Sequence, residues 1–170
     1  MDLGTHLFTG VLTASFWPNL DLRQRILVVL FSVLPDAFEW MHQLARKHYD
    51  NDGHLVPEDY NRLSKKIEGH WYLWPYNFMH NIFSPAVFLG ISIYYHRPLV
   101  YSFMWLAHLL LDLPSHKIML GLKIWWPFSQ KRIHGFFDWW LVKFFRGWEL
   151  FGYWAILAII SIILIRSFWQ

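Results

Sequence analysis

The sequence predicts an all-α, membrane-associated helical bundle with short apolar hairpins and a C-terminal transmembrane helix. Of the 170 residues, 55% are hydrophobic and 21% are aromatic. Only 16% are charged, against roughly 25% in typical soluble domains. Apolar segments of helical length recur between turn signals. The formal net charge of +3 suits contact with anionic lipid headgroups, and no basic run of the kind that binds nucleic acid is present.

The N-terminal part is expected to contain two apolar hairpins joined by more polar helices. In chain order, helices are expected at Leu3–Phe16, Leu22–Leu34, Ala37–His48, Pro57–Glu68, Asn77–Tyr95 and Pro98–Leu113. The turn WPNLD separates the first two, with Asp21 as the cap of the second, and HRP separates the last two. Each arm of the second hairpin has fewer apolar residues than the ~20 that span a bilayer. We therefore expect a buried or half-inserted hairpin.

The C-terminal part divides into an amphipathic helix and a transmembrane helix. Apolar and basic residues recur at helical spacing over residues 129–147, which predicts a basic helix lying in a membrane surface. From Leu150 to Ile165 no residue is charged, and aromatic residues stand near both ends, which predicts a transmembrane helix at 148–169. The domains are therefore 1–147, partly embedded in the membrane, and 148–169. The positive-inside rule places residues before this helix in the cytoplasm, so a bacterial protein would lie in the inner membrane.

The segment HLLLDLPSH, residues 108–116, carries His108, Asp112 and His116 at intervals of four in an apolar region. Residues four apart share one helix face, so His108 and Asp112 could hold one cation together. Pro114 ends or kinks the helix before His116, which makes His116 the weakest member of the row. A lone His on an apolar face is more often a core residue bonded to a carbonyl. A buried Asp112, however, must have a partner, because ionisable groups are costly in apolar surroundings.

Both hairpins bring further His and Asp residues to similar heights. His80 and Asp112 lie 17 and 15 residues from a turn centred on Arg97, which at ~1.5 Å per residue is a height difference of about 3 Å. His6 and Asp36 lie 13 and 17 residues from the turn of the first hairpin, a difference of about 6 Å. Helices pack ~8–10 Å apart, so side chains at one height can meet. The sequence predicts a shared metal site formed by His6, Asp36, His80, His108, Asp112 and, at its edge, His116.

Five short motifs occur in an order that resembles a known family. They are THLFTG (5–10), LPD (34–36), YNFMHN (76–81), HLLLDLPSH (108–116) and WPFS (126–129). The chain thereby resembles the YdjM-type family of membrane-bound, metal-dependent hydrolases, which is distantly similar to zinc-dependent phospholipase C. The resemblance implies that His6, Asp36, His80, His108 and Asp112 match the ligand positions and that His116 matches a frequent extra His. The chain differs from the family pattern at Phe38, where a second acidic residue is frequent, and at Met79 and Asn81.

These features lead to the hypothesis of a metal-dependent hydrolase with its site near the cytoplasmic face. Zinc is the metal that best suits a His/Asp set, and manganese or iron also fits. A metal-activated water would attack an ester or phosphoester, with a small-molecule or lipid ester as substrate, membrane lipids as partners and no nucleic acid. Glu39, three residues after Asp36, is the candidate general base, although it can also pair with His42 or be solvated. The alternative is a non-enzymatic integral membrane protein, in which a structural metal or a buried His/Asp network holds the hairpins.

Overall fold

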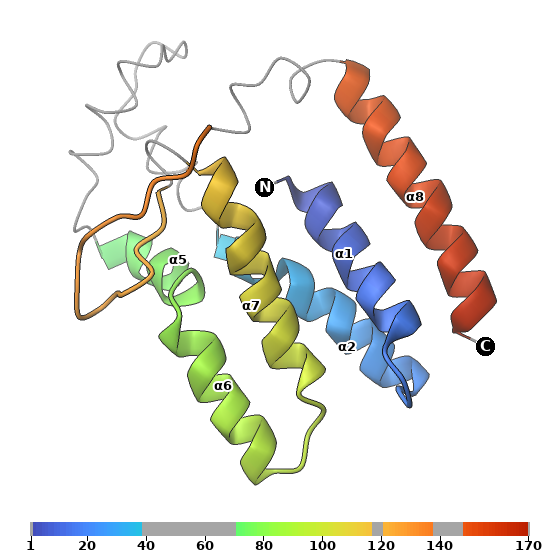
Figure 1. Cartoon of the computed structure of the whole chain (residues 1–170), viewed down its shortest axis with the longest axis horizontal. Helices are drawn as coiled ribbons and strands as arrows, with labels where there is room; N and C mark the ends of the chain where they lie inside the picture. The colour runs from blue at the N-terminus through green and yellow to red at the C-terminus, as the bar shows by residue number, and fades with distance from the viewer. Residues whose placement is uncertain (1, 39–70, 117–120, 138–147, 170) are drawn as a thin grey trace.

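The computed structural model describes residues 2–38, 71–116, 121–137 and 148–169, which form the helical bundle of Figure 1. The described helices are α1 (Leu3–Phe16), α2 (Leu22–Val33), α5 (Trp74–Met79), α6 (Phe83–Tyr94), α7 (Val100–Asp112) and α8 (Trp148–Phe168), with the 3₁₀ turns η1 (Leu34–Phe38), η2 (Trp71–Leu73) and η3 (Leu113–Ser115). The all-α fold class is confirmed. The helices expected at Ala37–His48 and Pro57–Glu68 lie outside the described residues, except that Ala37 and Phe38 belong to η1.

Side chains cap the N-terminal ends of both helices in the first hairpin. The Asp2 carboxylate caps α1 by accepting the Thr5 backbone N–H at 3.1 Å and the Thr5 hydroxyl at 2.6 Å. Asp21 and Gln24 form a reciprocal capping box at the start of α2. Between the helices, Asn19 has a φ of 59°, a left-handed conformation in which Asn is enriched over most residues. The chain therefore reverses within five residues, and α2 runs back along α1.

Gly10 sets the distance between α1 and α2. A Cβ atom at this position would collide with the Ser32 side chain and lie 3.0 Å from Val29 Cα. The two helices therefore approach each other closely at this level because no side chain separates them. This close approach matters for the site, because the Ser32 carbonyl accepts a hydrogen bond from a histidine of α7.

The second hairpin consists of three helices where the sequence predicted two. The expected helix Asn77–Tyr95 is broken at His80–Ile82, and α5 and α6 lie on either side of the break. Asn81 joins them, because its Nδ2 donates to the Asn77 carbonyl at 3.0 Å and its Oδ1 accepts the backbone N–H groups of Phe83 and Ser84 at 2.8 and 2.9 Å. An amide side chain that satisfies both helix ends makes the break favourable.

The prediction of an amphipathic helix at 129–147 is wrong for residues 129–137, which are not helical. Residues 138–147 lie outside the described part of the chain. Backbone N–H groups in this segment bond to distant carbonyls, so no helical ladder forms. Leu122 and Ile133 exchange two backbone hydrogen bonds at 3.0 and 2.8 Å. The N–H of Gly135 bonds to the His116 carbonyl at 2.9 Å. These long-range backbone hydrogen bonds prevent the helix that the spacing of apolar side chains suggested.

Helix α8 lies along the outside of α1, and the two helices run in the same direction (Figure 1). At its C-terminal end, Trp169 Nε1 donates to Ser15 Oγ at 3.0 Å, and the Phe168 and Phe16 rings are 5.0 Å apart. Among the described helices, α8 is long and apolar enough to cross a membrane, and none of its residues is buried. Membrane association is therefore supported by length and composition.

The interior of the bundle has an apolar part and a polar part. The apolar core lies toward the hairpin turns and consists of Ala14, Leu20, Val28, Val100, Tyr101 and Met104. The buried polar residues His6, His108 and Asp112 lie toward the opposite, open end of the hairpins. The apolar core thus holds the helices together at one end and leaves the charged side chains gathered at the other.

We predict that Gly10→Ala destabilises the protein by about 1–3 kcal/mol, because the added methyl group overpacks the α1–α2 contact. Denaturant unfolding in detergent would measure the change. Gly90→Ala in α6 is the matched control, since nothing lies within 4 Å of a Cβ at that position. The control should be neutral or gain up to about 1 kcal/mol from helix propensity. Equal effects at both positions would contradict the packing role of Gly10.

Candidate metal centre

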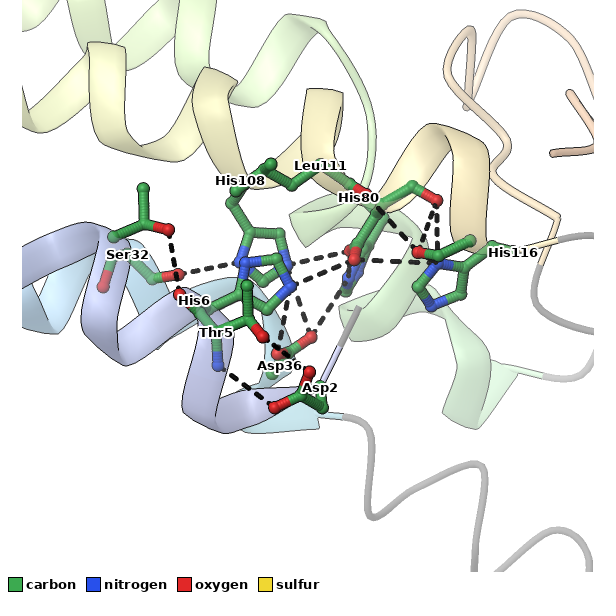
Figure 2. Close-up of polar contacts among 12 residues, drawn as sticks. Asp2, Thr5, His6, Ser32, Asp36, His80, His108, Leu111 and His116 are labelled. Atoms are coloured by element: carbon green, nitrogen blue, oxygen red, sulfur yellow. Dashed lines mark hydrogen bonds and ion pairs between the residues drawn. The ribbon is translucent and has the colours of Figure 1, made fainter. Parts of the chain in front are cut away.

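Four residues from three separate parts of the chain meet at the open end of the bundle. His6 comes from α1, Asp36 from η1, and His108 and Asp112 from α7. One ligand atom from each of them lies within 4.8 Å of the others. His6, His108 and Asp112 are almost fully buried, whereas the Asp36 side chain is 12% exposed. Figure 2 shows His6, Asp36 and His108 pointing toward one another.

The two carboxylates lie between the histidines. One oxygen of each carboxylate faces His6. The Nε2 atom of His6 is 3.0 Å from Asp112 Oδ1 and 3.9 Å from Asp36 Oδ2. The other oxygens, Asp112 Oδ2 and Asp36 Oδ1, lie 3.0 and 3.3 Å from His108 Nε2. The same two oxygens lie 3.6 and 3.7 Å from His80 Nε2. His80 therefore joins the centre from the side of His108, outside the four-residue group.

Backbone carbonyls orient the rings of His80 and His108. His108 Nδ1 donates to the Ser32 carbonyl at 2.8 Å, and His80 Nδ1 donates to the Tyr76 carbonyl at 3.0 Å. A carbonyl oxygen can only accept, so each Nδ1 carries a proton and each ring directs its Nε2 atom toward the carboxylates. Metal-ligating histidines are commonly held in this way.

The helices around His80 hold it at the height of Asp112. Trp105 on α7 donates its indole N–H to the Met79 carbonyl at 2.8 Å, which fixes the end of α5 against α7. The Tyr76 ring stacks on the His80 ring, with the ring centroids 4.0 Å apart. The His6 and His108 rings are stacked as well, at 3.7 Å. Three imidazole rings are thus placed around two carboxylates with little room to rotate.

His116 lies beside the centre and not within the four-residue group. Its Nδ1 is 2.9 Å from the Asp112 backbone carbonyl and 3.6 Å from Asp112 Oδ1. Because this nitrogen donates to the carbonyl, it offers no lone pair to a metal in this orientation. Burial lowers the pKa of His116 to about 4, so this ring is neutral at pH 7. The catalytic candidate Glu39 lies outside the described residues.

The two carboxylates of the centre require a positively charged group beside them. Burial raises the pKa of Asp36, but interactions with the His108 and His80 rings outweigh it and hold that pKa below its usual range. The Asp36 carboxyl is therefore ionised at neutral pH. A second carboxylate, Asp112, lies deeper and is fully buried. Burial lowers the pKa of His108, but the Asp112 and Asp36 carboxylates outweigh it and raise this pKa to about 10, so a protonated His108 balances part of their charge. A divalent cation between the carboxylates would supply the positive charge in its place.

The donor set fits a divalent transition metal. Tetrahedral zinc with bonds of ~2.0 Å places its ligand atoms about 3.3 Å apart, and the N–O contacts of His6 and His108 with both carboxylates range from 3.0 to 3.9 Å. Within the described part of the chain, the buried Nε2 atoms of His80 and His108 have no hydrogen-bond partner. Buried nitrogens of this kind, aimed at two carboxylates, are typical of metal ligands.

A polar network that sequence reasoning missed connects α8 to the first turn of α1, next to His6. Trp154 Nε1 donates to Asp2 Oδ1 at 2.8 Å, and the Tyr153 hydroxyl lies 2.7 Å from Thr5 Oγ1. Asp2 is 1% exposed, and Thr5 precedes the ligand candidate His6. An Asp directly before an apolar helical run is an N-cap signal, which could have identified Asp2. No sequence signal indicates that α8 supplies its partners.

Comparison of the chain with protein-family models, with curated proteins and with solved structures gives no match in any of the three. The resemblance to the YdjM-type hydrolases therefore stays a prediction. The arguments that follow rest on the geometry of the described residues.

We predict that acidification from pH 6.5 to 4 destabilises the protein partly through His116. The folded pKa of about 4 lies below the ordinary value of 6.5, so the unfolded chain binds more protons in this window and stability falls as pH falls. The full contribution is on the order of 3 kcal/mol. His116→Asn keeps a donor for the Asp112 carbonyl and removes the titration. Unfolding midpoints measured from pH 7 to 4 should fall less in the variant, and parallel curves would contradict the assignment.

We also predict that Trp154→Phe destabilises the protein by about 1.5–3 kcal/mol, because it removes a hydrogen bond to the buried Asp2 carboxylate. Thermal or denaturant unfolding in detergent would measure this. Trp148→Phe is the control, since Trp148 lies on the same helix and is 86% exposed. A loss of stability in the control as large as that in Trp154→Phe would show that the Asp2 contact is not the cause.

Proposed function

We propose that this protein is a membrane-bound, metal-dependent hydrolase of an ester or phosphoester. The observation that carries the proposal is the convergence of three histidines and two aspartates in one buried centre. A zinc ion, or manganese or iron, would be held by His6, Asp36, His108 and Asp112, with His80 beside them. When bound, such an ion supplies a Lewis acid and a water of lowered pKa.

The protein residues have distinct tasks in this proposal. The Ser32 and Tyr76 carbonyls keep His108 and His80 in the tautomer that offers Nε2. Asp36 is the most exposed member of the four-residue group, so its side of the centre is the side from which water and substrate arrive. A carboxylate general base on that side completes the proposal, and Glu39 is the sequence candidate for it.

The proposed location is the inner membrane in a bacterial cell. Helix α8 is long and apolar enough to span a bilayer. Basic residues before its uncharged stretch Leu150–Ile165, such as Lys131 and Arg132, outnumber Arg166 after that stretch, which favours a cytoplasmic position for the N-terminal end of α8. The open end of the bundle, which carries the centre, faces the same side as that N-terminal end (Figure 1).

We predict that the protein purified without chelator contains a transition metal and that Asp112→Asn loses most of it. Asp112 contacts all three histidines, so a neutral amide there removes one anionic ligand from every possible arrangement. Elemental analysis of the two proteins measures the metal content. The control is Asp21→Asn, which alters an exposed carboxylate that caps α2, and Asn caps helices about as well as Asp.

Two results would count against the proposal. Wild-type protein without any bound transition metal would leave the non-enzymatic His/Asp network as the better explanation. Metal that is present and equally retained by Asp112→Asn would show that it binds elsewhere. If the metal is lost from the variant, release of product from chromogenic esters and phosphodiesters by wild type, and not by Asp112→Asn, would support hydrolysis. Metal binding without any hydrolysis would instead support a structural metal.

A further inference from the structure

We infer that residues 121–137 form a clasp that holds His80 against the two carboxylates of the centre, and that Gly135 is the positioning residue of this clasp. The segment includes the motif WPFS, for which the proposed function has no role. The clasp is built from contacts that are independent of any metal, and in this respect it goes beyond the proposed function. Only its effect on a bound metal rests on that function.

The clasp is held together by contacts between its own two halves. Leu122 and Ile133 exchange two backbone hydrogen bonds, as described above. The side chain of Lys123 is buried, and its Nζ donates to Gln130 Oε1 at 2.8 Å. Leu122 is fully buried as well, so the first half of the clasp is anchored in the interior of the protein. Although it is not helical, the segment therefore has a defined conformation that can hold other elements in place.

One end of the clasp bonds to the chain just beyond Asp112. The last carbonyl groups of a helix have no partner within that helix and need one elsewhere. The Pro114 carbonyl, in the turn η3 that follows α7, accepts the backbone N–H of Phe136 at 2.9 Å. The His116 carbonyl accepts the backbone N–H of Gly135 at 2.9 Å. The clasp thus satisfies the end of the helix that carries Asp112 and fixes its position.

The other end of the clasp bonds to the break between α5 and α6, next to His80. The backbone N–H of Ile82, directly before α6, donates to the Ile124 carbonyl at 3.0 Å. The ring of Phe128, which belongs to the motif WPFS, packs edge-on against the ring of Phe83 with the centroids 5.1 Å apart. The motif therefore contributes to a contact that holds the chain immediately after His80.

The clasp consequently bridges the open end of the second hairpin. Figure 1 shows it in orange beside α5 and the end of α7. His80 Nε2 lies 3.6 Å from Asp112 Oδ2, and the clasp bonds to the chain two residues after each of them. Helix α5 has only six residues, too few to keep its position without contacts to its neighbours. His80, the C-cap of α5, therefore depends on the clasp, whereas His6 and His108 lie within longer helices.

Gly135 lies directly against η3. A Cβ atom at this position would collide with the Leu113 carbonyl oxygen and lie 2.5 Å from the Pro114 carbonyl oxygen. Both are backbone atoms, which cannot rotate away as the end of a flexible side chain can. Any larger residue must therefore push the clasp away from η3 and weaken the hydrogen bond from Phe136 to the Pro114 carbonyl.

The alternative is a segment that serves only as a surface for lipid. Phe128 and Phe136 are 81% and 85% exposed, and aromatic side chains suit the interface of a membrane. That role explains the exposed rings. It does not explain why backbone groups of the segment bond to the ends of two helices, or why Gly135 has no room for a side chain. A positioning role accounts for these contacts and is therefore favoured.

Two labels can measure whether the clasp holds α5 against α7, because the chain contains no Cys. Nitroxides at Trp74→Cys on α5 and Leu110→Cys on α7 occupy exposed positions. In metal-free protein in detergent, dipolar EPR gives the distribution of distances between them. We expect one narrow distribution, which Gly135→Ala broadens or shifts. Gly90→Ala on α6, where nothing lies within 4 Å of a Cβ, should leave it unchanged. An unchanged distribution in Gly135→Ala would overturn the inference.

A second pair of variants acts on the clasp without crowding η3. Phe128→Ala removes the ring contact with Phe83 from an exposed position, so the fold is retained. Phe136→Ala is the matched control, since it removes an equally exposed ring and keeps the backbone N–H that bonds to η3. Broadening in Phe128→Ala and not in Phe136→Ala supports the clasp even if Gly135→Ala fails to fold. Identical distributions in the two variants would count against it.

The effect on a bound metal is tested with Co²⁺, whose absorption reports its ligands. His80→Asn keeps a donor for the Tyr76 carbonyl and removes Nε2. We expect His80→Asn and Gly135→Ala each to weaken Co²⁺ binding by about tenfold or more. The double variant should bind no more weakly than Gly135→Ala, because His80 no longer reaches the metal there. Losses that multiply, or no loss in His80→Asn, would overturn this effect.

The two experiments separate the clasp from the proposed function. Wild-type protein that does not bind Co²⁺ would count against the metal-dependent hydrolase and against the effect of the clasp on a metal. The distances between the labels are measured without metal and decide on the clasp in that case too. Conversely, distances that do not respond to Gly135→Ala or Phe128→Ala would remove the clasp and leave the hydrolase proposal standing.

Discussion

The fold depends on the burial of two carboxylates together with three imidazole rings inside an apolar bundle. Asp112 is fully buried, and an isolated buried carboxylate is strongly destabilising. Its position is therefore acceptable only when the surrounding helices bring compensating groups to it. His6 and Asp36 come from the first hairpin, His80 and His108 from the second, so the two hairpins must be in register for the charges to be balanced. The lengths of the individual helices are therefore constrained by how the two hairpins pack together.

Packing at the other end of the molecule makes this register possible. The apolar core around Ala14, Val28 and Val100 holds the two hairpins together near their turns. Gly10 allows α1 and α2 to approach at the level of Ser32, whose carbonyl orients His108. Helix α8 adds a third support, because its indole N–H groups bond to Asp2 and Ser15 at the two ends of α1. The C-terminal helix is thus part of the bundle that presents the centre.

Some features could be predicted from the sequence and others could not. The range Leu3–Phe16 was predicted as observed, since its apolar residues end at the turn WPNLD. The break after His80 was missed, because it depends on Asn81 satisfying two helix ends at once. The amphipathic pattern over 129–137 was misleading, because backbone groups of that segment pair with Leu122 and His116. Hydrogen bonds between distant segments leave little trace in local periodicity.

The sequence by itself determined which side chains share a height. The rise per residue of a helix is a property of its backbone, so counting from each turn brings His80 to the height of Asp112 and His6 near the height of Asp36. The tertiary structure decided how each helix is rotated about its axis, and therefore which atoms meet. It placed His108 and His80 with Nε2 toward the carboxylates and gave the Nδ1 of His116 to a backbone carbonyl. Rotation is set by side-chain packing between helices, which no single segment encodes.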